Sequence, residues 1–88
     1  MTEIRVDGNQ LAGALRDVFS FDVTTATGTC CGCGRQAPLA EVDVYTRAPG
    51  LVARCRSCGQ VLLRLVHGPG RVWLDMQGLR SLELVVPV

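Results

Sequence analysis

The residues most able to do chemistry in this chain of 88 amino acids are its five cysteines. Four of them belong to two CxxCG units, Cys30–Gly34 and Cys55–Gly59. The 21 positions from 34 to 54 lie between Cys33 and Cys55, and two CxxC pairs with a spacer of about 20 residues are typical of tetrahedral metal sites. We therefore predict that one metal ion is bound by Cys30, Cys33, Cys55 and Cys58.

The spacing within each unit has a geometric reason. Two residues between the cysteines allow a tight turn that points both sulfurs at one centre. The glycine that follows, Gly34 or Gly59, can adopt a positive φ and lets backbone N–H groups approach the thiolates. The alternative is two reduced dithiols in a redox protein. A redox CxxC normally stands alone before a helix, however, and strand-like sequence follows these units.

Zinc is the metal that we expect, with one ion per chain. It suits four thiolates, is not redox-active, and keeps no open position for a substrate once four side chains bind it. Iron in a rubredoxin-like site is the alternative, because paired CxxCG units also suit that metal. Such iron sites usually lie in aromatic-rich cores, and only 5% of this chain is aromatic. Since the site is closed and the chain has no Ser-His-Asp set, phosphate-binding loop or HExxH motif, we predict no enzyme activity.

Three further residues have side chains of chemical interest. Cys31 could replace Cys30 only by forming a strained C-x-C pair with Cys33, so we expect it to be an oxidation-prone bystander on the surface. His67 adjoins a Gly-Pro-Gly turn, and we expect it to flank that turn rather than to bind metal. Trp73 either packs beneath the N-terminal helix or lies exposed at a partner surface, and the sequence leaves both possibilities open.

The elements that must position the cysteines are mainly strands. Residues 41–46 alternate strictly, residues 48–50 form a turn signal, and residues 51–54 lead straight into Cys55, so a β-hairpin fills the spacer. A helix is predicted over residues 7–19, because apolar side chains recur at helical spacing after Asp7, a suitable N-cap. Further strands are predicted at 21–25, 61–66, 71–76 and 81–86, with a turn at 67–70.

These elements predict a small, mostly-β (α+β) protein with antiparallel strands and one N-terminal helix. A chain of 88 residues has room for a single domain. Within residues 1–88 we expect a helical segment at 1–20, a metal-binding core at 27–67 and C-terminal strands at 68–88. So small a domain buries a limited core, for which a structural metal is a standard remedy.

The composition of the chain indicates whether it folds and in which compartment of the cell we expect it. A hydrophobic fraction of 48% with 19% charged residues indicates a folded chain rather than a disordered one. No apolar run approaches the roughly 20 residues of a membrane helix, and residues 1–7 lack the pattern of a secretory signal. We therefore expect a cytoplasmic protein with reduced thiols. The odd number of cysteines also argues against a disulfide framework.

The charge is uneven, although the net charge is only +1. Residues 44–74 carry no acidic residue and five arginines: Arg47, Arg54, Arg56, Arg64 and Arg71. With Tyr45 and Trp73 at its edges, this segment has the composition of a nucleic-acid-binding face. The simpler interpretation is charge balance. Four thiolates around a divalent ion carry about −2, and the arginines that flank the ligands are Arg35, Arg54 and Arg56.

The two CxxCG units and the hairpin between them, over residues 27–67, resemble a zinc ribbon. The whole chain is further similar to a domain-of-unknown-function family of short actinobacterial proteins, in the segments Val6–Leu15, Tyr45–Gly50 and Leu63–Arg71. The resemblance implies a zinc-ribbon-like antiparallel sheet and an origin in a GC-rich genome, and it implies no particular activity. Cys31 departs from the usual ribbon turn, which has one thiol at each end only.

These observations predict a small cytosolic protein in which zinc stabilises the fold and the hairpin or the Trp73 region docks an unidentified protein. Two alternatives stay open: a nucleic-acid-binding zinc ribbon related to transcription or translation, and a rubredoxin-like iron electron carrier. No membrane partner is expected. An edge strand at residues 82–86 could pair with a second copy, so we expect a monomer or a weak homodimer.

Overall fold

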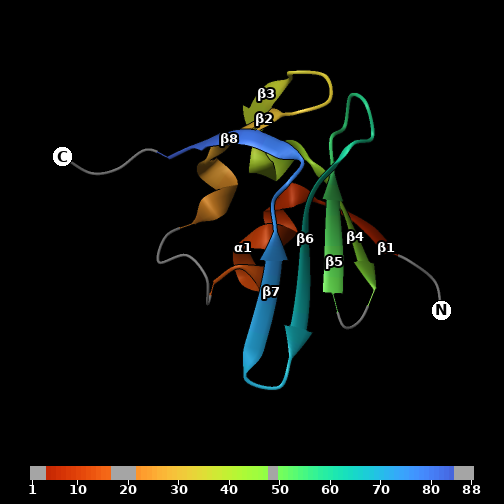
Figure 1. Ribbon diagram of the computed structural model, residues 1–88, viewed down its shortest axis with the longest axis vertical. Helices are drawn as coiled ribbons and strands as arrows, with labels where there is room; N and C mark the ends of the chain where they lie inside the picture. The colour runs from red at the N-terminus through yellow and green to blue at the C-terminus, as the bar shows by residue number, and fades with distance from the viewer. Residues whose placement is uncertain (1–3, 17–21, 48–49, 85–88) are drawn as a thin grey trace.

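The computed structural model describes residues 4–16, 22–47 and 50–84, and its eight strands form two antiparallel sheets (Figure 1). The larger sheet has the order β1–β4–β5–β6–β7, with bounds β1 Ile4–Asp7, β4 Asp43–Arg47, β5 Gly50–Arg54, β6 Val61–Gly68 and β7 Arg71–Asp75. The smaller sheet has the order β3–β2–β8, with bounds β2 Thr27–Cys30, β3 Gln36–Pro38 and β8 Leu79–Glu83. The predicted class, a small mostly-β protein with antiparallel strands, is confirmed.

The hairpin expected between the two cysteine units is confirmed as well. Strands β4 and β5 pair in register from Asp43 opposite Arg54 to Arg47 opposite Gly50. Strands β6 and β7 correspond to the strands predicted at 61–66 and 71–76 and pair with each other. The last strand, β8, begins two residues earlier than predicted, and residues 85 and 86 lie outside the described part of the chain.

The helical elements are shorter than the sequence suggests. The 3₁₀ helix η1 (Gly8–Gln10) leads into α1 (Leu11–Ala14), so the predicted helix at 7–19 is correct only in its first half. Asp7 is the N-cap of η1, where the predicted helix begins, and its carboxylate accepts a hydrogen bond from the Asn9 N–H at 3.0 Å. After Ala14 the chain forms a turn, and the predicted positions 17–19 lie outside the described residues.

Two expectations for the N-terminal half are wrong. Residues 1–20 are not helical throughout, because Ile4–Asp7 forms β1 and pairs with β4. Residues 23–25, predicted as part of a strand, form the 3₁₀ helix η2 (Val23–Thr25). The cause is Asp22, whose side chain accepts the N–H of Thr24 at 3.0 Å and its hydroxyl at 2.6 Å. These local hydrogen bonds outweigh the strand preference of the sequence, and β2 starts only at Thr27.

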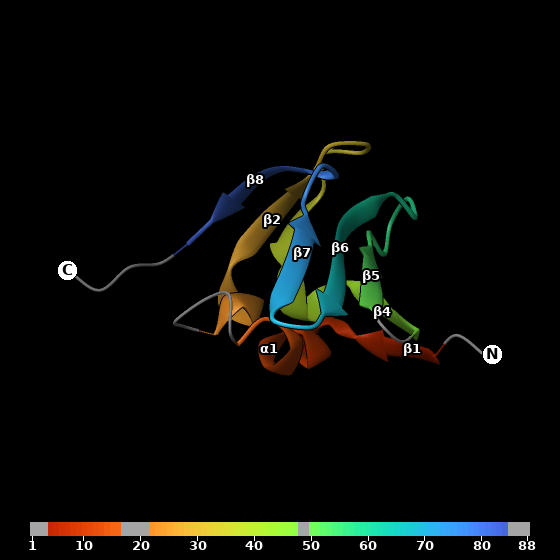
Figure 2. The same ribbon diagram turned by 60° about the horizontal axis from the view of Figure 1, so that its bottom comes forward.

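The core lies between the inner face of the larger sheet and the helical segments. The inner face of β4, β5 and β6 contributes four fully buried side chains, Val44, Ala53, Leu63 and Leu65, and α1 lies against the same face (Figures 1 and 2). A third 3₁₀ helix, η3 (Leu39–Glu41), contributes the buried Leu39. The largest fully buried side chains are Leu11, Leu15, Leu39, Leu63, Leu65, Val23 and Val44. The opposite face of the larger sheet, which we call the outer face, carries Arg5, Asp7, Asp43, Tyr45, Val52, Arg54, Arg64, Val66, Arg71, Trp73 and Asp75.

Replacing Asp22 with Ala should lower the midpoint of thermal unfolding at neutral pH. The hydrogen bonds from the Thr24 hydroxyl and N–H hold the pKa of Asp22 below its ordinary 3.8. The carboxylate therefore stabilises the fold above pH 3.8 and loses this effect as the pH falls through the lower folded value. Asp22→Asn keeps an acceptor oxygen and should lose less than Asp22→Ala. Equal midpoints for all three proteins in circular dichroism melts would contradict this role.

Candidate metal centre

Both cysteine units fold into the same turn. In the second unit, the Cys55 N–H donates to the Gln60 carbonyl and the Gly59 N–H donates to the Cys55 carbonyl, both at 2.9 Å. The first unit repeats this pattern with Cys30 as its first residue. The closing glycines, Gly34 and Gly59, have φ of +78° and +80°, the left-handed conformation expected from the sequence. The sequence repeat is therefore also a structural repeat.

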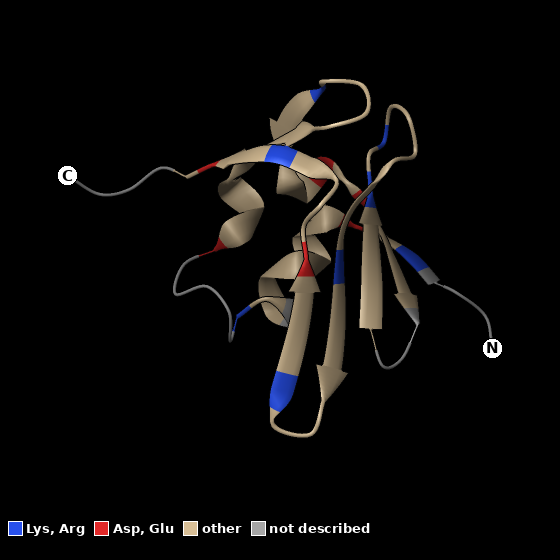
Figure 3. Ribbon diagram, in the orientation of Figure 1, with Lys and Arg blue, Asp and Glu red and all other residues tan. Residues whose placement is uncertain are grey.

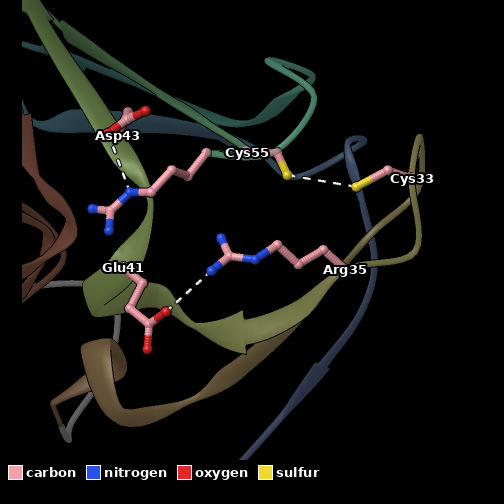
Figure 4. Close-up of polar contacts among 6 residues, drawn as sticks. Cys33, Arg35, Glu41, Asp43 and Cys55 are labelled. Atoms are coloured by element: carbon pink, nitrogen blue, oxygen red, sulfur yellow. Dashed lines mark hydrogen bonds and ion pairs between the residues drawn. The ribbon is translucent and has the colours of Figure 1, made fainter.

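The two turns bring four sulfurs together. The Sγ atoms of Cys30 and Cys58 lie 3.6 Å apart. The Sγ atoms of Cys33 and Cys55, which Figure 4 shows, lie 3.7 Å apart. All four Sγ atoms lie within 4.8 Å of one another. A tetrahedral zinc ion with Zn–S bonds of about 2.3 Å requires sulfurs about 3.8 Å apart. The four cysteines singled out in the sequence thus have the spacing and the donor chemistry to hold one metal ion.

The cluster lies at the border between the core and solvent. Cys30 and Cys55, the first cysteine of each unit, are buried, whereas Cys33 and Cys58 are exposed. Cys30 ends β2 in the smaller sheet, and the second unit joins β5 to β6 in the larger sheet. An ion bound here would therefore link the two sheets.

The pKa values of the clustered thiols indicate what a bound cation would contribute. Burial raises the pKa of Cys30, but hydrogen bonds from the N–H groups of Cys33 and Gly32 and from the thiols of Cys58 and Cys33 together lower it to about 7. The Gly32 N–H lies 3.3 Å from the Cys30 sulfur. At Cys58 the Gln60 N–H lowers the pKa, whereas lost hydration and the three neighbouring cysteines raise it to about 12. Four thiolates are thus unfavourable here by themselves, and a bound metal cation would supply the missing positive charge.

The arginines beside the cluster contact other groups of the protein. Arg35 and Arg56 form ion pairs with Glu41 and Asp43, at 3.2 and 3.6 Å (Figure 4). Arg54 donates to the carbonyl of the closing glycine of the second unit at 3.0 Å. These contacts hold the arginines beside the two cysteine turns, and the expectation that the arginines balance the charge of the site stays a prediction.

The other candidates lie outside the cluster of sulfurs. Cys31 is exposed, and its backbone N–H donates a hydrogen bond to the Gly78 carbonyl at 3.0 Å. His67 is exposed on β6 next to the β6–β7 turn. Trp73 is 54% exposed on β7, so of its two possible positions the structure shows the exposed one.

Sequence reasoning missed Gly78, which supports the first turn from the β7–β8 connection. Its carbonyl accepts the Cys31 N–H, and its own N–H donates to the Leu62 carbonyl at 3.2 Å. A Cβ at this position would collide with the Val61 carbonyl oxygen, so only glycine allows this approach. The available signal was a glycine in a turn between two predicted strands.

Iodoacetamide should modify one cysteine in the metal-loaded protein. Cys31 is exposed and is not one of the clustered sulfurs, whereas metal coordination protects the other four thiols. Mass spectrometry should find a single adduct at Cys31, and all five cysteines should react after chelation in denaturant. Rapid modification of Cys33 or Cys58 in the loaded protein would contradict the assignment of the ligands.

No helix in the described part of the chain has the length and apolar character needed to cross a membrane. The fold and the site define a small β protein of two antiparallel sheets with a four-cysteine cluster able to bind metal. The chain belongs to the Family of unknown function (DUF6510), which matches residues 2–87. No curated protein and no solved structure matches it.

Proposed function

We propose that this is a cytoplasmic protein in which one structural zinc ion, held in a zinc-ribbon-like site, stabilises a small protein-interaction module. The observation that carries the proposal is the sulfur cluster, with all four Sγ atoms within 4.8 Å of one another. Four thiolates fill the coordination shell of zinc, which is typical of structural sites, and this supports a protein without enzyme activity. The actinobacterial origin suggested by the sequence stays a prediction.

A small cleft near the second turn supports the same proposal. Gln60, Arg64, Asp75 and Gln77 contribute polar side chains to a space of about 230 Å³. Pockets that bind drug-sized molecules measure about 300–1,000 Å³ and are mostly apolar. This cleft is smaller and polar, so it offers little room for a substrate.

The β6–β7 hairpin is the surface that we propose for docking. Three of the four large apolar side chains exposed in the described part of the chain lie on it: Val66, Val72 and Trp73. Trp73 and Val66 are direct neighbours across the two strands on the outer face. An exposed tryptophan beside aliphatic side chains and arginine is the composition of an interface hot spot.

Elemental analysis and a visible spectrum of protein from its natural host test the metal. We expect one zinc per chain and no colour. One iron per chain with thiolate-to-iron absorption would contradict the proposal and support the rubredoxin-like alternative. For the interaction role, we expect a protein to be captured by the wild-type chain and lost with Trp73→Ala, while the variant keeps its zinc. Capture that is independent of Trp73 would exclude the hairpin as the docking surface.

Nucleic-acid binding is a second candidate, favoured by one observation. Arg54, Arg64 and Arg71 lie on the outer face together with Tyr45 and Trp73. The Arg54 guanidinium carbon lies 5.9 Å from the centre of the Tyr45 ring. Asp43 and Asp75 share this face and reduce its positive charge, which is why we rank this function second. A salt-dependent affinity for single-stranded RNA that weakens with Arg64→Ala would support it, and a flat titration would exclude it.

A further inference from the structure

Strand β7 is a free edge of the larger sheet. It pairs with β6 on one side, and among the described residues no strand pairs with its other side. In an antiparallel ladder, backbone groups of alternate residues point to opposite sides, so every second residue of β7 presents an N–H and a C=O outward. The same strand exposes Trp73 at 54% and Val72 at 39%. An apolar free edge of this kind favours pairing with another strand.

We propose that β7 pairs with β7 of a second copy of this chain, antiparallel and centred on Trp73. The inference rests on the proposed function, since it names the partner that docks on the hairpin. The strand reads Arg-Val-Trp-Leu-Asp and is complementary to itself in the reverse direction. In this register Arg71 lies opposite the partner's Asp75, Val72 lies opposite the partner's Leu74, and the two Trp73 side chains are neighbours.

Each pair in this register matches in charge or polarity. Arg71, Trp73 and Asp75 lie on the outer face, while Val72 and Leu74 lie on the inner face. Figure 3 shows one end of β7 basic and the other end acidic. Among the described residues, neither Arg71 nor Asp75 forms an ion pair. The dimer would therefore gain two cross-strand ion pairs, an aromatic pair and two aliphatic pairs, and none of these contacts displaces an existing ion pair.

The symmetry of this pairing suits the fold. Residues directly opposite in an antiparallel pair share a face, so a two-fold axis through Trp73 perpendicular to the sheet keeps the inner faces of both copies on one side. The two five-stranded sheets then join into one continuous sheet. Such an interface is isologous and closes at two copies, which excludes further growth through the same edge.

The other free edges are less suited to self-pairing. β1 could place Arg5 opposite Asp7 of a second copy, but the chain turns into η1 at Gly8 and shortens that pairing to three residues. Pro38 in β3 lacks an N–H donor. β8, the edge favoured from the sequence, would oppose Leu79 to Glu83 and Arg80 to Leu82 when centred on Ser81. Only β7 combines length, charge match and apolar match.

The size of the contact predicts a weak dimer. A single pair of five-residue strands buries less than a standard stable interface, so association should depend on concentration. Trp73 is the only tryptophan in the chain, and its fluorescence therefore reports directly on this contact. Burial of the indole in the dimer should shift its emission to shorter wavelength.

The test is sedimentation of the zinc-loaded full chain over a range of concentrations, together with Trp73 emission on dilution. We expect a monomer–dimer equilibrium and an emission maximum that moves to longer wavelength as the dimer dissociates. Arg71→Asp and Asp75→Arg each oppose like charges twice across the two-fold axis. Each should weaken dimerisation about tenfold or more. The double variant R71D/D75R reverses both pairs and should restore it.

The matched control is Arg5→Asp, which makes the same charge change on β1 at the opposite edge and should leave dimerisation unchanged. A protein that stays monomeric at all concentrations would overturn the inference, and so would a dimer that is insensitive to Arg71→Asp. Zinc content and circular dichroism of each sample distinguish a failure of the proposed dimer from a failure of the proposed function. A folded, zinc-containing monomer contradicts the dimer alone, whereas a folded protein that binds no zinc contradicts the proposed function.

Discussion

Cys58→Ser protein should fail to retain metal and should be unfolded at room temperature. Binding of a structural zinc ion contributes about 10–16 kcal/mol in small zinc domains. The whole free energy of unfolding of a typical domain is about 5–15 kcal/mol. If the variant cannot bind the ion, the free energy that it loses is as large as the whole free energy of unfolding expected for a chain of 88 residues. Far-UV circular dichroism and zinc analysis of the purified variant measure both effects.

The matched control is Cys31→Ser, one residue from a ligand but outside the sulfur cluster. It should keep one zinc ion per chain and melt like the wild type. Chelation of the wild-type protein should produce the same unfolded state as Cys58→Ser. If both variants melted like the parent, a four-thiolate site would be wrong.

Gly8→Ala should lower the free energy of unfolding by about 3 kcal/mol or more, the upper end of the range for overpacked cores. Gly8 is buried in η1, and a Cβ there would collide with the carbonyl oxygen of Leu39 and approach the Ala40 carbonyl carbon to 2.8 Å. Both are backbone atoms, so the clash cannot be relieved by a change of rotamer. η3, which carries the fully buried Leu39, would have to move.

Gly13→Ala provides the comparison within the same helical segment. No atom lies within 4 Å of the Cβ that this change would add. Alanine in a helix is favoured over glycine by about 1 kcal/mol, so this variant should be slightly more stable than the wild type. Urea unfolding of the zinc-saturated proteins measures both changes. Similar midpoints for the two variants would show that the contact between η1 and η3 is not tightly packed.

The candidate site could be predicted because short, continuous stretches of sequence mark each of its two turns. Both cysteine units share a pair of hydrogen bonds between residues at most five apart, and the closing glycine of each unit marks the positive φ. The β4–β5 hairpin could be predicted in the same way, since a strict alternation of apolar and polar residues is followed closely by a turn signal in the sequence. These features place both turns without any knowledge of distant contacts.

The missed elements depend on side-chain competition or on distant partners. Val23, Thr24 and Thr25 favour a strand by composition, and a single carboxylate, that of Asp22, directs them into η2. β1 has only four residues and is held by β4, almost 40 positions away. Trp73 alternates correctly on its strand, but its exposure follows from the position of β7 at the end of the sheet. Such outcomes are set by tertiary pairing rather than by local preference.

The pairing of β2 has a consequence for the order in which a growing chain can assemble. Cys30, at the end of β2, lies opposite Leu79 of β8, near the other end of the chain. All four cysteines leave the ribosome before β8 does, because the growing chain emerges with its N-terminus first. A metal ion bound at this stage would fix the position of β2 before β8, one of its two neighbouring strands, is available for pairing. Capture of a metal ion would then come before completion of the smaller sheet, and β8 would add to an edge that is already held in place.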